Sequence, residues 1–147
     1  MFNTGGRAST EVQKQARRRL IEQTRTGRFL GVGTKMLDML LGNKRRGDAT
    51  LRKKLIDMAL ESGKEVYIRQ QTAIINRIDS CATIKKAKIP FLCVSGAEDV
   101  MTAPELLQEV HALADNSQYY ELSDCGHLSP VEMPEKVTDI LKDWLKV

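Results

Sequence analysis

What the 147-residue sequence lacks already excludes several classes of protein. No stretch approaches the roughly 18 consecutive apolar residues that a membrane-spanning helix needs. The opening residues, Met1 to Gly6, lack the apolar segment of a signal peptide. Cysteine is scarce: the chain has three, Cys81, Cys93 and Cys125, and no two of them form a C-x-x-C motif. We therefore expect reduced thiols in a cytoplasmic protein, with no membrane partner. No zinc-finger spacing occurs, and we expect neither a metal nor a cofactor.

Aromatic residues are also few, at 5% of the chain, and this limits how its uneven charge is interpreted. Residues 7–54 hold 14 Lys and Arg against 4 Asp and Glu, a net charge of +10, while the rest of the chain carries −6. A basic segment of this kind suits nucleic acid. However, no aromatic side chains that would stack on bases lie among the basic clusters. We therefore interpret the clusters as solvated faces of amphipathic helices and disfavour nucleic acid as a partner.

The first half of the chain has the hydrophobic periodicity of helices. Apolar residues recur three and four positions apart, and Gly27, Gly42 and Gly63 each follow such a segment. The predicted helices cover residues 10–26, 28–41, 49–62 and 64–78. Together they indicate a small, basic bundle of short helices.

The pattern changes after Ile84. Residues 89–95 form a nearly continuous apolar run, which is typical of a strand buried on both faces of a parallel sheet. A helix over 103–114 follows, with Thr102 and Glu105 as an expected capping box. A second strand over 118–122 and a last helix over 134–146 complete the series. This strand–helix–strand–helix order predicts a parallel sheet with a right-handed crossover.

Polar side chains follow both predicted strands. Asp99 lies just beyond the first strand and His127 just beyond the second. If the strands are parallel neighbours, these two loops lie side by side, where open sheets gather reactive groups. A carboxylate on one imidazole nitrogen fixes the tautomer and leaves the other nitrogen free as a base. We therefore predict Asp99 and His127 as a catalytic pair.

In chain order, the second half contains the motifs Ile89–Asp99, Thr102, Pro104, Cys125-Gly126-His127, Glu132–Glu135 and Trp144-Leu145. This series resembles the carboxyl-terminal part of the α/β-hydrolase fold. In that family the acid follows the seventh strand and the histidine the eighth, which correspond to Asp99 and His127. Residues 8–76 resemble the family's helical cap, and Met1–Thr4 resemble the end of its sixth strand.

The resemblance implies an α/β fold: a partial parallel sheet of two or three strands with flanking helices, plus an N-terminal helical cap. We expect a residual strand and linker over 1–7, a cap-like segment over 8–80 and a core segment over 81–147. The implied parent is a serine hydrolase of esters, lactones or related small acyl substrates.

The sequence departs from the family in lacking the nucleophile. No G-x-S-x-G occurs, and the first five strands have no counterpart. We therefore expect a chain that corresponds to the second half of such an enzyme and has no more than trace activity alone. Ser95 and Ser129 do not follow a strand-to-helix elbow, and Cys125 is too near His127 in sequence for good attack geometry. His111 is expected to be a surface helix residue.

Three functional interpretations remain open. In the first, the chain is part of a serine hydrolase of acyl compounds. Six apolar residues of its cap then either shape an apolar substrate site or simply pack the cap: Phe29, Met36, Leu37, Leu40, Tyr67 and Ile74. In the second, the chain is a non-catalytic module that forms a homodimer through an unpaired strand edge. The third and least favoured is a basic binding module over residues 14–54.

Overall fold

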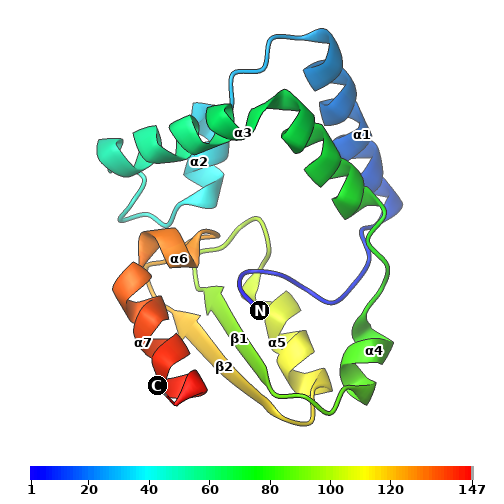
Figure 1. Ribbon diagram of the computed structural model, residues 1–147, viewed down its shortest axis with the longest axis vertical. Helices are drawn as coiled ribbons and strands as arrows, with labels where there is room; N and C mark the ends of the chain where they lie inside the picture. The colour runs from blue at the N-terminus through cyan, green and yellow to red at the C-terminus, as the bar shows by residue number, and fades with distance from the viewer. Residues whose placement is uncertain (147) are drawn as a thin grey trace.

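The computed structural model describes residues 1–146, which form a parallel sheet with helices on both faces and a helical layer above it (Figure 1). The elements, in chain order, are α1 (Glu11–Thr26), α2 (Thr34–Leu40), α3 (Ala49–Ile75), α4 (Cys81–Lys86), β1 (Phe91–Gly96), α5 (Pro104–Leu113), β2 (Ser117–Leu122), α6 (Ser129–Glu132) and α7 (Pro134–Leu145). The upper layer of α1, α2 and α3, here called the cap, faces the carboxyl ends of the strands.

The sheet has β1 at its centre. β2 pairs with β1 in parallel along its whole length, from Phe91 opposite Ser117 to Gly96 opposite Leu122. On the other edge of β1, Phe2 forms a single parallel bridge with Val94. The predicted parallel sheet of two or three strands, with flanking helices and an N-terminal helical cap, is therefore confirmed.

The two faces of the sheet are buried by different helices because strand side chains alternate in direction. Leu92, Val94 and Leu122 pack with residues of α7 on one face. Cys93 packs with residues of α4 and α5 on the other face. Burial on both faces explains why the β1 sequence is continuously apolar rather than alternating.

The cap has a core of its own, which also touches the rest of the protein. Leu37 and Leu41 are buried with Leu51 and Leu55 of α3, and the partly buried Leu128 and Val131 pack against this cluster. Because those last two residues lie in and beside α6, the cap is fixed to the loop that follows β2.

Several predicted helix bounds are wrong for identifiable reasons. The helix expected over 28–41 begins only at Thr34, since Gly31 adopts a φ of +72° and ends any helical run there. The helices expected over 49–62 and 64–78 are the two parts of α3, separated at Gly63, where φ is +80° and ψ is 170°. The short helices α4 and α6 were not predicted.

The expected capping box at Thr102 is also wrong. The residue that precedes α5 is Ala103, and no side chain caps the helix. The backbone N–H of Thr102 instead donates to Asp99 Oδ1. In contrast, α1 does begin with a capping box, formed by Thr10 and Gln13. The division of the chain at residues 7 and 80 stays a prediction. None of the described helices is long and apolar enough to span a membrane.

Candidate active site

Asp99 lies in the loop that follows β1, and its side chain is fully buried. Its Oδ1 accepts hydrogen bonds from the backbone N–H groups of Met101 and Thr102, both at 2.8 Å. Its Oδ2 accepts from His127 Nδ1 at 2.9 Å and from Asn3 Nδ2 at 3.1 Å. Four donors from three segments of the chain therefore surround one carboxylate.

These contacts decide the ionisation of Asp99. Burial alone would raise the pKa of its carboxyl. The hydrogen bonds from His127, from the backbone of Thr102 and from Asn3 outweigh burial and hold that pKa below its ordinary value. Asp99 is consequently an anion at neutral pH.

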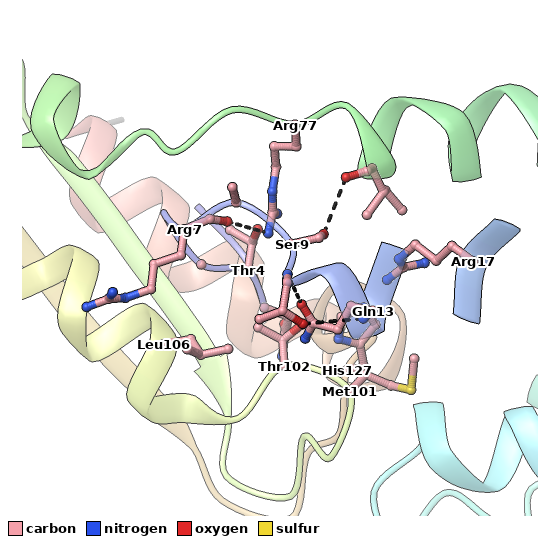
Figure 2. Close-up of a pocket in the computed structure, with 15 residues that line it drawn as sticks. Thr4, Arg7, Ser9, Gln13, Arg17, Arg77, Met101, Thr102, Leu106 and His127 are labelled. Atoms are coloured by element: carbon pink, nitrogen blue, oxygen red, sulfur yellow. Dashed lines mark hydrogen bonds between the residues drawn. The ribbon is translucent and has the colours of Figure 1, made fainter. Parts of the chain in front are cut away.

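His127 lies in the loop after β2, and its geometry fixes its tautomer. Because the ionised Asp99 can only accept, Nδ1 of His127 is the donor in the 2.9 Å bond between them. The neutral ring therefore presents an unprotonated Nε2. The side chain is 26% exposed and lines a cavity between the cap and the core (Figure 2). The predicted proximity of Asp99 and His127 is confirmed, while their catalytic role stays a prediction.

The loop carrying His127 touches the cap backbone directly. The backbone N–H of His127 donates to the carbonyl of Leu40 at 2.8 Å. A Cβ on Gly126 would lie 2.5 Å from the Gly42 nitrogen and 2.6 Å from the Leu40 oxygen, so only glycine fits there. The position of the imidazole thus depends on the cap.

Glu132 is a second buried carboxylate, only 1% exposed, and no sequence pattern predicts a role for it. It accepts from the backbone N–H of Gly42 at 2.7 Å. It also accepts from the backbone N–H groups of Gly126 and Leu128, each at 3.1 Å. Since these two residues flank His127, one carboxylate links the cap to both sides of the histidine.

The sequence also does not predict a role for Asn3. It is buried, with a φ of +44°, and its Nδ2 donates to Asp99 Oδ2 and to the Gly126 carbonyl. Its Oδ1 accepts from the Ser129 hydroxyl at 2.5 Å. Asn3 therefore holds Asp99 and the His127 loop together. No local pattern marks such a residue, because its partners lie about a hundred positions away in sequence.

In the described part of the chain, the side chains of Ser95, Ser129 and Cys125 form no hydrogen bond with the imidazole of His127. Ser95 is 1% exposed and shares a 2.6 Å hydrogen bond with the Tyr119 hydroxyl. Ser129 is fully buried against Asn3. Burial raises the pKa of the Cys125 thiol to about 12, which leaves it protonated and inert. Within residues 1–146, no group of three or more His, Cys, Asp and Glu side chains has the arrangement of a metal site.

The cavity beside His127 has a volume of about 410 Å³. Of the six apolar cap residues considered for a substrate site, only Ile74 lines it. Leu37 packs inside the cap core instead. The other lining residues come mainly from the segment before α1, from α1 itself and from the loop before α5, and most are polar. Five of the six residues are therefore absent from the lining of the cavity beside His127.

Comparisons with known proteins agree with this architecture, although no protein-family model matches the chain. The uncharacterised hydrolase YugF of Bacillus subtilis is 36% identical over 63 residues, which are 43% of this chain and 23% of that protein. The bifunctional epoxide hydrolase 2 of Rattus norvegicus is 31% identical over 68 residues, which are 46% of this chain and 12% of that protein.

Among solved structures, an esterase from Thermogutta terrifontis with malate bound superimposes with a TM-score of 0.88 at 27% identity, covering 99% of this chain and 54% of that one. An enol-lactonase from Burkholderia xenovorans gives a TM-score of 0.80 at 22% identity, covering 99% and 55%. The chain spans about half the length of these structures and less than a quarter of the two curated relatives.

Proposed function

Since the chain has the carboxyl-terminal part of the α/β-hydrolase fold and is related to hydrolases of that family, we propose that it supplies the acid and the histidine of a serine-hydrolase triad. The substrates are esters, lactones or related small acyl compounds. The observation that carries the proposal is the 2.9 Å hydrogen bond from Nδ1 of His127, which lines the cavity, to the buried Asp99; it leaves Nε2 unprotonated in the neutral ring.

The proposed chemistry is acyl transfer to a serine and then to water. The serine oxygen attacks the acyl carbon while its proton passes to His127 Nε2, which then protonates the leaving alcohol oxygen. In the second half, His127 takes a proton from water, the resulting hydroxide attacks the acyl-serine, and the proton returns to the serine oxygen. Asp99 stays ionised throughout and stabilises the imidazolium.

The nucleophile in this proposal lies outside the 147 residues, since they contain no G-x-S-x-G. The sheet edge at Phe2 offers a place for the strand that carries it. Val94 bonds to the Met1 carbonyl and to the Asn3 N–H, so the N–H and C=O of Phe2 point away from β1. A parallel strand paired there would end beside the Asp99 and His127 loops.

A chimaera tests the proposal. The chain is joined behind the remaining half of the Thermogutta esterase, and hydrolysis of p-nitrophenyl butyrate is measured. We expect turnover by the chimaera and no more than trace turnover by the chain alone. His127→Ala and Asp99→Asn should each lower kcat on the order of 10³-fold or more.

The matched controls are His111→Ala and Asp115→Asn. His111 bonds to Ser117, and Asp115 pairs with Lys88 at the surface, so neither variant should change kcat. A chimaera that folds by circular dichroism but stays inactive would contradict the proposal. Equal activity of the His127→Ala and His111→Ala variants would also contradict it.

The same edge at Phe2 favours an alternative, a non-catalytic module that forms a homodimer by strand pairing. Sedimentation equilibrium of the chain tests this directly. The alternative requires a dimer that Phe2→Pro dissociates, because proline removes the outward N–H. A monomer at all concentrations contradicts it.

A further inference from the structure

The cavity beside His127 has a basic lining. Its lining contains three arginines, Arg7, Arg17 and Arg77, and no aspartate or glutamate. Hydroxyl groups of the segment before α1 and of Thr102 line it as well. Such a lining raises the local concentration of anions over that of neutral molecules.

Two of the three arginine charges are not neutralised by an ion pair. Arg7 forms a salt bridge with Glu109. Arg17 Nη1 donates to the neutral amide oxygen of Gln71 at 2.7 Å, and Arg77 Nη2 donates to the backbone carbonyl of Arg7 at 2.8 Å. In residues 1–146 neither Arg17 nor Arg77 lies within salt-bridge distance of a carboxylate. Most of their N–H donors therefore remain available.

The two guanidinium groups and the imidazole come from opposite sides of the cavity. Arg17 lies on α1 and Arg77 just after α3, both on the cap side, whereas His127 and Thr102 belong to the core loops (Figure 2). Ile74, Met101 and Leu106 contribute apolar surface to the same cavity. An extended molecule with an anion at one end and an ester at the other matches this distribution.

Resting on the proposed function, we propose that the substrate is an ester or lactone that carries a second, free carboxylate. Arg17 and Arg77 bind that carboxylate, and the acyl carbon lies toward His127 Nε2. A planar guanidinium matches a carboxylate in geometry and charge, and such charge-assisted hydrogen bonds are stronger than neutral ones. A neutral ester of the same size offers the arginines no anionic partner.

Binding to the chain itself tests this inference. Monomethyl succinate, an ester with a free carboxylate, and neutral dimethyl succinate are titrated separately while backbone amide shifts are followed by ¹H–¹⁵N NMR. We expect monomethyl succinate to bind roughly tenfold or more tightly than the diester. The shifts should cluster at Arg17, Arg77 and His127.

Substitutions then locate the carboxylate. Arg17→Gln and Arg77→Gln should each weaken monomethyl succinate binding several-fold and leave dimethyl succinate unchanged. Arg17→Lys, which keeps the charge but not the planar donor set, should fall between the wild type and Arg17→Gln. Arg19→Gln, on the same helix but away from the cavity lining, is the matched control and should bind like the wild type. Equal affinities for the two esters, or equal effects of the glutamine variants at 17, 77 and 19, would overturn the inference.

This test is separable from that of the proposed function. Binding needs no nucleophile, so an inactive chimaera combined with arginine-dependent binding contradicts the triad proposal alone. An active chimaera that hydrolyses both succinate esters with equal kcat/KM, and does so unchanged in Arg17→Gln and Arg77→Gln, contradicts only the substrate class.

Discussion

Replacement of Glu132 by glutamine tests how the cap and the His127 loop are joined. The two carboxylate oxygens face three backbone donors, with Gly42 on Oε2, Leu128 on Oε1 and Gly126 shared between them. Glutamine keeps the size of the side chain but offers one acceptor oxygen. Whichever way the amide turns, its NH₂ faces either the Gly42 or the Leu128 N–H.

The expected cost follows from that count. One buried N–H loses its acceptor, which costs about 1–3 kcal/mol, and the remaining bonds lose the assistance of a charge. We therefore expect Glu132→Gln to lower the free energy of unfolding by about 2–4 kcal/mol. Glu135→Gln, an exposed neighbour in the first turn of α7, should change it by less than about 1 kcal/mol.

Urea denaturation followed by circular dichroism measures the loss, and amide hydrogen exchange locates it. Exchange in Glu132→Gln should accelerate at Gly42, Gly126 and Leu128 beyond the global change. An unfolding free energy within about 0.5 kcal/mol of the wild type, with unchanged exchange at these three amides, would refute the reasoning.

Three further outcomes follow from the same structure. Gly126→Ala should lower the free energy of unfolding, measured in urea, by at least about 2 kcal/mol, because the new Cβ would collide with the cap backbone. Gly47→Ala, whose Cβ would have nothing within 4 Å, should not lower it. Equal urea midpoints for the two variants would contradict this. Because the pKa of Asp99 is lower in the folded than in the unfolded protein, ionised Asp99 stabilises the fold at pH values above the unfolded pKa of about 3.9. The difference in unfolding free energy between the wild type and Asp99→Asn should therefore narrow as the pH falls through and below that value. A difference that does not change with pH would contradict this. In the native protein iodoacetamide should modify the partly exposed Cys81 before the buried Cys125, and rapid labelling of Cys125 would show that its burial is wrong.

Local sequence patterns were sufficient for the sheet and for the Asp99–His127 pair. The apolar run over residues 89–95, which covers most of β1, and the polar residues just beyond each strand are local features, and parallel pairing brings the ends of the two strands together. Parallel strand ends are the expected place for such residues, so the proximity followed once the two strands were identified.

The rest depended on contacts that no local pattern carries. Asn3 bonds to residues 96 to 126 positions away, and the bond that joins Glu132 to the cap comes from Gly42, 90 positions away. Neither residue lies in a periodic apolar pattern. The predicted capping box at Thr102 is wrong because Asp99 accepts the Thr102 N–H that Glu105 would accept in such a box, and α5 begins one residue later, after Ala103. The predicted helical turn before Thr34 does not form, because Gly31 adopts a positive φ in the folded chain.

The basic residues that line the cavity include one from a cluster whose sequence pattern predicts a solvated helix face. Arg17 belongs to the basic run of α1, yet it lines the cavity, whereas its neighbour Arg19 does not. Helical spacing alone does not say which of three consecutive arginines faces a cavity, because that depends on how α1 packs against α3.

The most direct test of the account is the tautomer of His127, read from the ¹⁵N shifts of its two ring nitrogens at alkaline pH, with His111→Ala used to assign the resonances. We expect a proton on Nδ1 and an unprotonated Nε2 in the wild type, because ionised Asp99 accepts from Nδ1. Asp99→Asn should move the proton to Nε2, since the asparagine amide can donate to Nδ1. A wild-type imidazole protonated on Nε2, or one that Asp99→Asn leaves unchanged, would contradict the claim that Asp99 holds His127 ready to act as a base.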